Sequence, residues 1–140
     1  MGNHHEIIMQ KMIHLANEML DFSYVPYSHF PVGATLLGKD GKIYTGCNIE
    51  NASFGLTNCA ERTALFKAVS EGVHNFEAIV ITSRGDRAVS PCGACRQVIS
   101  EFCAADMPVW LTNEAGDLKK TTVEELLPYY FVAEDMDLDD

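Results

Sequence analysis

The sequence predicts a single α/β domain in which helices cover both faces of a partly parallel sheet. The chain has 140 residues, about the length of one domain. Apolar residues recur with helical spacing in its first part, and short β-branched segments alternate with helical segments in the remainder. Strand–helix–strand units of this kind favour parallel strands with helices packed on the sheet. We therefore expect a layered αβα architecture.

The first half of the chain is expected to form a helix followed by a β-hairpin. The helix is predicted over 5–22, where one face carries Ile8, Met12, Leu15, Ala16 and Met19. A loop is expected at 24–30, because Pro26 and Pro31 favour irregular backbone. Two strands, at 32–37 and 43–49, follow it, because the Asp-Gly pair at 40–41 is a turn signal between them.

The second half alternates helices and strands. After a polar loop at 50–58, the elements expected in order are a helix at 59–71, a strand at 78–82, a helix at 92–102 and a strand at 109–112. Gly72 ends the first of these helices. Thr122 and Glu125 have the spacing of a capping box, which predicts a last short helix that ends at Pro128.

Charge and hydropathy along the chain disfavour nucleic-acid-binding, membrane-spanning and secreted proteins. Twenty acidic and ten basic residues give a net charge of −10, which disfavours a nucleic-acid partner. Five of the last seven residues are acidic, so we expect a domain at 1–133 and a solvated acidic tail at 134–140. No apolar stretch approaches the roughly 18–20 residues of a membrane span. No signal peptide is visible at the N-terminus, so the cytoplasm is the expected location.

Two short motifs, Cys59-Ala-Glu61 and Pro91-Cys-Gly-Ala-Cys95, carry the strongest chemical signal. Three thiolates, those of Cys59, Cys92 and Cys95, can bind Zn²⁺ tetrahedrally and leave the fourth position for water, as a catalytic zinc requires. Both motifs begin predicted helices, whose N-termini stabilise thiolates. Because residues two apart diverge within a helix, Cys59 and Glu61 can share this site only at a helix start.

Glu61 is the expected proton carrier at this zinc. Zinc lowers the pKa of bound water to about 7, and a nearby carboxylate can accept the released proton. The spacing C-x-E…P-C-x-x-C is also the three-cysteine form of the zinc nucleobase-deaminase signature.

Other interpretations of the cysteines remain open from the residues alone. The C-x-x-C pair could be a redox dithiol, although that chemistry uses neither a third cysteine nor a glutamate. A structural zinc site would need a fourth ligand, and the candidates His29 and His74 are not at ligand spacing. Cys47 and Cys103 are expected to be packing residues.

Four segments together resemble the small, homotetrameric, zinc-dependent cytidine deaminases of the cytidine and deoxycytidylate deaminase superfamily. These segments are 27–34, 46–53, 59–64 and 91–97, and the likeness extends from the first helix to Tyr130. The resemblance implies a three-layer αβα sandwich with a mixed five-stranded sheet, and one Zn²⁺ per subunit. It also implies hydrolytic deamination of cytidine and 2′-deoxycytidine to uridine and 2′-deoxyuridine plus ammonia, a reaction of pyrimidine salvage.

The same resemblance implies roles for individual residues. The substrate contacts it implies are Phe30 against the pyrimidine, Asn48 and Glu50 at the ribose 3′-hydroxyl, the main chain of Ala60 and Cys92 at the base edge, and Phe131 closing the site. Arg62 would hydrogen-bond the thiolates and offset their negative charge. From the residues alone, ordinary alternatives are a strand end for Asn48 and Glu50, a core aromatic for Phe30 and a surface ion pair for Arg62.

Rival functions share part of this pattern. A blasticidin-type deaminase has the same zinc motif and size, whereas a polynucleotide deaminase needs a basic groove. An inactive nucleoside-binding or structural zinc protein would not need Glu61. Two positions depart from the family: Phe54, where many relatives have Tyr, and Asn58, where many have an apolar residue. The segment 52–55 resembles one that completes a neighbouring subunit's site, so we expect neighbouring subunits to complete the active sites of the tetramer.

Overall fold

The structure is a computed structural model and describes residues 2–85 and 93–126. Its sheet has the strand order β2-β1-β3-β4-β5. The strands are β1 (Val32–Gly38), β2 (Ile43–Cys47), β3 (Phe76–Ser83), β4 (Pro108–Thr112) and β5 (Leu118–Thr122). The helices are α1 (Gly2–Met19), η1 (Leu20–Phe22), η2 (Phe54–Leu56), α2 (Ala60–Ser70), α3 (Gly93–Phe102) and α4 (Val123–Leu126). Among the strands of the described residues only β3 and β4 pair in parallel, so the predicted mixed five-stranded sheet is confirmed.

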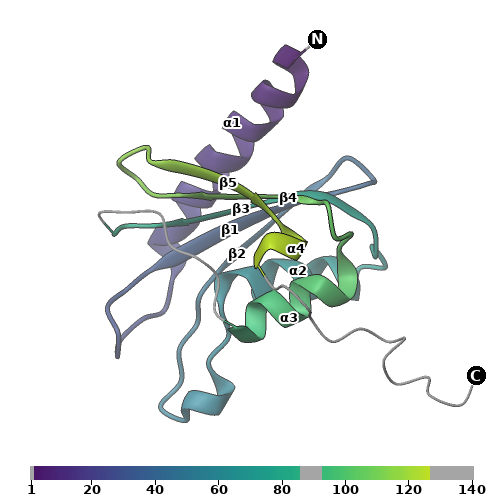
Figure 1. The fold of residues 1–140 in the computed structure, drawn as a ribbon. Helices are drawn as coiled ribbons and strands as arrows, with labels where there is room; N and C mark the ends of the chain where they lie inside the picture. Colours follow the sequence, from purple (N-terminus) through teal and green to yellow (C-terminus); the bar gives the residue numbers. More distant parts are fainter. Residues whose placement is uncertain (1, 86–92, 127–140) are drawn as a thin grey trace, which may run out of the picture.

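Helices cover both faces of this sheet, as predicted. α1 lies on one face, while α2 and α3 lie side by side on the other (Figure 1). β3 alternates between the two cores: Ile79 and Ile81 pack on the α2 side, and Ala78 and Val80 on the α1 side. Because β3 is buried on both faces, it is almost continuously apolar.

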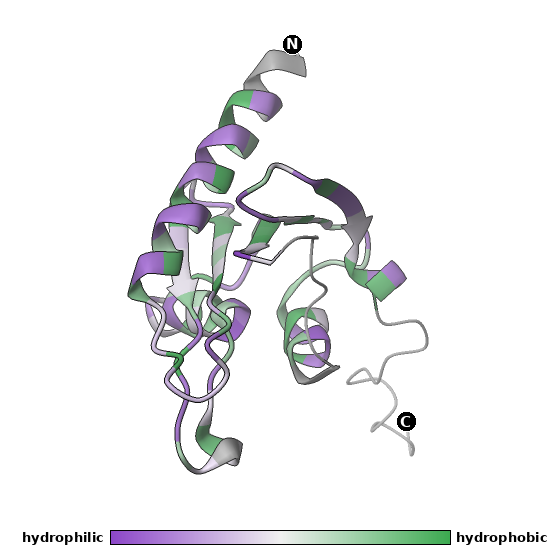
Figure 2. Cartoon of the chain, turned by 90° about the vertical axis from the view of Figure 1, so that its left-hand side faces the viewer, coloured by the Kyte–Doolittle hydropathy of each residue, from purple (hydrophilic) through white to green (hydrophobic). Residues whose placement is uncertain are grey.

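The amphipathic pattern of the first helix has the expected consequence. Met9, Met12 and Ala16 are buried against the sheet, and hydrophilic and hydrophobic residues alternate along α1 in Figure 2. The helix begins earlier than expected, at Gly2, and its last turn is the 3₁₀ segment η1.

Two parts of the sheet differ from the sequence-based prediction. No strand was expected from the residues at 118–122, where β5 forms an edge with three exposed and two half-buried residues. Such an edge shows no apolar alternation, and lysines are common there; Lys120 lies 4.5 Å from the Trp110 ring centroid. β2 ends at Cys47 rather than at Ile49, which bridges to Tyr24 and to Asn58 instead.

A close approach between β2 and α2 fixes the start of α2. A Cβ atom on Gly46 would lie 2.5 Å from the Ala60 carbonyl oxygen and 2.6 Å from the Ala64 nitrogen. Only glycine therefore lets the first turn of α2 pack this closely on the strand. Lys67 adds a hydrogen bond of 2.7 Å from its Nζ to the Thr45 carbonyl, farther along the same helix.

The helix start predicted at Thr122 is confirmed, and Thr122 and Glu125 bond each other there through the Thr122 hydroxyl. The Glu125 amide donates to Thr122 Oγ1 at 3.4 Å, and the Thr122 hydroxyl donates to Glu125 Oε1 at 3.0 Å, at the start of α4. Pro128, expected to end this helix, lies outside the described residues, as does the segment 134–140.

Candidate functional site

Cys59 and Glu61 meet the geometric condition set by their spacing. Cys59 is the N-cap of α2, with extended backbone (φ −78°, ψ 159°), and its carbonyl accepts the Thr63 amide at 3.0 Å. Glu61 is the second residue of the helix and is only 3% exposed. The pair therefore lies at the helix start, where both side chains can reach one site.

Cys95 brings the second motif to the same place. It is the third residue of α3 and is fully buried. Its thiol interacts with the Glu61 carboxyl, whose pKa it lowers, and with the Arg62 guanidinium, whose pKa it raises. The first turns of α2 and α3 thus meet in one cluster of two thiols, one carboxyl and one guanidinium.

Arg62 faces the thiols rather than an acidic surface partner. Its Nη2 lies 3.4 Å from Cys59 Sγ and 3.4 Å from the Thr57 carbonyl oxygen. Within residues 2–85 and 93–126, its Nε is buried and has no hydrogen-bond partner. The contacts with Cys59 and Cys95 raise the pKa of the guanidinium. A permanent cation held against two thiols is suited to compensate thiolate charge.

The Glu61 carboxyl lies in surroundings that favour its protonated form. Burial raises its pKa to about 7, and the neighbouring Cys59 adds to this effect, whereas Arg62 opposes it. A carboxyl that titrates near neutral pH can both accept a proton and return it.

The donor set fits a zinc ion. Thiolates are preferred zinc ligands, and the two described ones lie together beside a compensating cation. The third predicted ligand, Cys92, lies outside the described residues. Within those residues, accordingly, no group of three or more His, Cys, Asp or Glu side chains could hold a metal ion.

A cavity of about 370 Å³ lies beside this cluster. It is lined by Tyr27, Ser28, Glu50, Asn51 and Thr57. Thr57 connects the cavity to the thiol cluster. Its carbonyl accepts a hydrogen bond from Arg62 of the cluster, and its hydroxyl accepts one from the amide of Asn51 in the cavity wall at 3.1 Å. The volume is in the range of small-molecule sites.

Asn48 and Glu50 both hold the loop that precedes β1. Asn48 Oδ1 accepts the Val32 amide at 2.9 Å, and Asn48 Nδ2 donates to the Phe30 carbonyl at 2.9 Å. Glu50 Oε1 accepts the Tyr27 and Ser28 amides, each at 3.1 Å. The structure therefore assigns these two residues a loop-holding role, and their predicted contact with ribose stays a prediction.

Phe30 is 39% exposed, so the alternative of a core aromatic is wrong. A Cβ atom on Gly85 would lie 3.3 Å from its Cε1, which places the ring directly against the backbone that follows β3. Asn113 fixes this backbone by donating to the Gly85 carbonyl at 3.2 Å. Packing of the ring against a pyrimidine stays a prediction.

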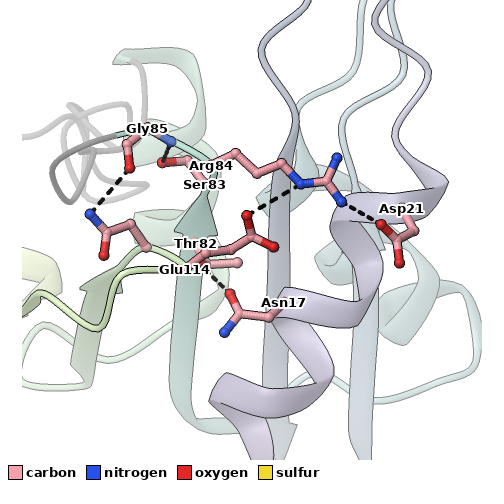
Figure 3. A network of polar contacts seen from close by, with 8 residues as sticks. Asn17, Asp21, Thr82, Ser83, Arg84, Gly85 and Glu114 are labelled. Atoms are coloured by element: carbon pink, nitrogen blue, oxygen red, sulfur yellow. Dashed lines mark hydrogen bonds and ion pairs between the residues drawn. The ribbon is translucent and has the colours of Figure 1, made fainter.

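Arg84 ties the same region to two other elements. Its guanidinium contacts Asp21 of η1 and, through Nε, lies 3.4 Å from Glu114 Oε1 after β4 (Figure 3). Thr82 donates to Asn17 Oδ1 of α1 at 2.7 Å nearby. The loops at this end of the sheet are thus fixed to one another by polar contacts.

The polar residue Asn58, which departs from the family pattern, has a local explanation. Its Nδ2 donates to Thr63 Oγ1 at 3.1 Å, and that hydroxyl lies 3.0 Å from the Cys47 carbonyl and 3.1 Å from the Cys59 carbonyl. Asn58 and Thr63 therefore help to fix the backbone at Cys59. Sequence reasoning did not identify Thr63 or Thr57, because neither belongs to a periodic pattern or a ligand spacing.

The remaining predicted residues have these positions. Ala60 is buried at the start of α2, and its main-chain contact with a base stays a prediction. Cys92 and Phe131 lie outside the described residues. Cys47 and Cys103 are buried and form no disulfide, which confirms their expected packing role.

Comparisons with known proteins agree with this geometry. The profile of the cytidine and deoxycytidylate deaminase zinc-binding region matches residues 6–111. A cytidine deaminase from Sporosarcina psychrophila is 56% identical over 128 residues, covering 91% of this chain and 94% of its own. A blasticidin-S deaminase from Bacillus cereus is 38% identical over 126 residues, covering 84% and 88%. The crystal structure of a cytidine deaminase from Burkholderia pseudomallei superposes with a TM-score of 0.84 at 46% identity, covering 87% of this chain and 98% of that one.

Proposed function

The chain belongs to the cytidine and deoxycytidylate deaminase family, and from this premise we propose that it deaminates cytidine and 2′-deoxycytidine by zinc-dependent hydrolysis. The products are uridine or 2′-deoxyuridine and ammonia. The observation that carries the proposal is the buried Glu61 carboxyl, set at the start of α2 against the thiol of Cys95 and beside Arg62.

The chain's own residues supply binding and proton transfer. Cys59, Cys92 and Cys95 would hold the zinc, which when bound makes water a nucleophile at neutral pH. Glu61 accepts a proton from the attacking water and gives it to N3 of the pyrimidine as the water oxygen adds to C4. Glu61 then takes the remaining proton from the added hydroxyl and gives it to the 4-amino group, so that the C4–N bond breaks, ammonia leaves and the C4 carbonyl forms. Arg62 offsets the charge of the thiolates that it contacts.

The cavity favours a free nucleoside over a nucleotide or a nucleic acid. The pKa of a glutamate is ordinarily well below neutral, and hydrogen bonds from Ser28 lower that of Glu50 further, so the carboxylate in the cavity wall is ionised at neutral pH. An ionised carboxylate accepts a sugar hydroxyl but repels a phosphate. The net charge of −10 acts in the same direction. The contacts of Asn48 and Glu50 with the 3′-hydroxyl, and of Phe30, Ala60, Cys92 and Phe131 with the base, belong to this proposal.

A homotetramer whose neighbouring subunits complete the active sites is also part of the proposal. It is supported by large exposed apolar side chains: Phe22, Tyr24, Tyr27, Ile49, Leu56 and Phe66. Tyr27 lines the cavity itself, and Tyr24 pairs with Ile49 beside it. Size-exclusion chromatography with light scattering should give a mass four times the chain mass of 15.5 kDa. A monomer would overturn this part.

The proposed domain is 1–133, followed by a dispensable acidic tail at 134–140. Deleting the tail should leave cytidine turnover unchanged, and a large loss would show that the tail belongs to the domain. No helix within residues 2–85 and 93–126 is long and apolar enough to cross a membrane. The proposed setting is pyrimidine salvage in the cytoplasm.

A substrate panel tests the function. The zinc-loaded protein is assayed for ultraviolet absorbance change with cytidine, 2′-deoxycytidine, blasticidin S and a cytosine-containing oligonucleotide. We expect turnover of both nucleosides and little change with the other two. Turnover of blasticidin S in preference to cytidine, or of the oligonucleotide, would overturn the proposal in favour of a rival deaminase.

A further inference from the structure

The Ser28 hydroxyl joins two predicted substrate-binding residues in the loop before β1. It donates a hydrogen bond to Glu50 Oε2. The hydroxyl oxygen of Ser28 also accepts a hydrogen bond from the Phe30 amide at 3.1 Å. Ser28 therefore contacts the residue expected at the ribose and the backbone of the residue expected at the pyrimidine. It also lines the cavity, together with Glu50.

The backbone around Ser28 is held in an uncommon conformation. His29, the next residue, has a φ of 59°, a left-handed value that is uncommon outside glycine. The His29 amide donates to the Val25 carbonyl at 3.0 Å, and the bond from Phe30 to Ser28 encloses His29 in a tight turn. A non-glycine residue keeps such a backbone only where its surroundings fix it. The Ser28 hydroxyl is thus held in one place by the turn.

The hydrogen bonds of Glu50 leave room for a ligand at one oxygen. Each carboxylate oxygen can accept two hydrogen bonds. Among the described residues, Oε1 accepts two amides, from Tyr27 and Ser28, whereas Oε2 accepts only the Ser28 hydroxyl. Oε2 therefore retains capacity for one more donor, on a residue that lines the cavity.

We propose that Ser28 is a positioning residue that holds Glu50 Oε2 toward the sugar of the substrate and thereby sets the preference for nucleosides that carry a 3′-hydroxyl. This inference rests on the proposed function and on the assignment of Glu50 to the ribose. The largest influence on the pKa of Glu50 is the Ser28 hydrogen bond, which lowers it because the bond favours the charged carboxylate.

The readout is a substrate ratio rather than activity alone. For each variant, kcat/KM is measured for cytidine and for 3′-deoxycytidine, and the ratio of the two values reports recognition of the 3′-hydroxyl. Ser28→Ala should lower this ratio about tenfold, since a hydrogen bond to a charged group is typically worth that much. Ser28→Thr keeps the hydroxyl and should restore most of the ratio.

A matched control separates this role from a general effect of removing a serine. Ser70 is also exposed, and its hydroxyl makes one local bond, to the Lys67 carbonyl at 2.7 Å, far from the cavity. Ser70→Ala should leave the ratio at the wild-type value. A general disturbance of the loop in Ser28→Ala would lower kcat/KM for both substrates together and leave the ratio unchanged, which would overturn the inference.

Glu50→Gln distinguishes failure of the inference from failure of its premise. If Glu50→Gln lowers the ratio and Ser28→Ala does not, the positioning role of Ser28 is wrong while the ribose assignment stands. If Glu50→Gln leaves the ratio unchanged, both the ribose assignment and the inference are wrong. Absence of cytidine turnover in the wild-type protein would instead overturn the proposed function.

Discussion

Replacing Gly46 by alanine should damage the active site through the packing of α2, because the new side chain would meet the backbone at the start of that helix. The new Cβ would lie 2.5 Å from the Ala60 carbonyl oxygen, whereas ordinary contact begins at 3.4 Å. The first turn of α2, which carries Cys59 and Glu61, must therefore move by about 0.9 Å. A misplacement of about 1 Å can cost about a hundredfold in catalysis, so we expect kcat/KM for cytidine to fall about a hundredfold.

The same substitution should also lower stability. Overpacking of a close contact typically costs about 1–3 kcal/mol. For a chain of this length, that corresponds to a fall in Tm of roughly 3–12 °C. Thermal unfolding followed by circular dichroism measures the loss, and the deamination assay is run well below the lowest Tm so that every variant is folded.

Gly72→Ala is the control, because Gly72 follows the opposite end of the same helix. Its φ of 92° strains any other residue, but a Cβ there would meet nothing within 4 Å. We expect a stability loss of about 1–2 kcal/mol with kcat/KM within about twofold of wild type. The reasoning fails if Gly46→Ala keeps a kcat/KM close to that of Gly72→Ala. Crowding at the start of α2 would then have no effect on catalysis beyond the loss of stability that the two variants share.

Three further predictions concern individual side chains. Asn113→Ala should lower the free energy of unfolding by about 1–3 kcal/mol, because Asn113 is buried and bonds Gly85 and Asp117. Urea unfolding measures this loss. The exposed control Asn75→Ala should be near neutral in the same experiment. Burial raises the pKa of Cys103 from 9.0 to about 12, so the thiol ionises first in the unfolded chain and the free energy of unfolding should fall as pH rises above 9.0. Urea unfolding at several pH values should show that this fall is shallower for Cys103→Ala than for wild type. The same pH dependence in both proteins would contradict this. Metal analysis should find about one zinc per chain in wild type and Cys103→Ala but little in Cys59→Ala; equal zinc in both variants would contradict the ligand assignment.

The sequence predicted the starts of α2 and α3 and the thiol cluster well because their signals are local, whereas α1 begins earlier than expected. The N-cap position of Cys59 follows from spacing, since only a helix start lets Cys59 and Glu61 share a site. The two faces of the buried strand β3 likewise follow from its apolar run. In contrast, β5 is an edge strand with three exposed and two half-buried residues, and its pairing with β4 leaves no pattern in its own residues.

The cavity wall was harder to predict, because its contacts join distant parts of the chain. The bond from Ser28 to Glu50 spans 22 positions, and that from the Tyr27 amide to Glu50 spans 23. Neither a serine nor a glutamate in a loop has a spacing that indicates its partner. The family resemblance selected Glu50 for its expected contact with substrate, whereas the structure shows it first as the residue that holds the loop.

The most direct test of the central claim is the zinc content and cytidine turnover of Glu61→Gln, measured on one preparation beside wild type. Glu61 is proposed to move protons and not to bind metal. The variant should therefore keep about one zinc per chain and lose turnover by about 10²–10⁴-fold, measured as ammonia release. A variant that keeps its zinc and deaminates cytidine at the wild-type rate would contradict the account.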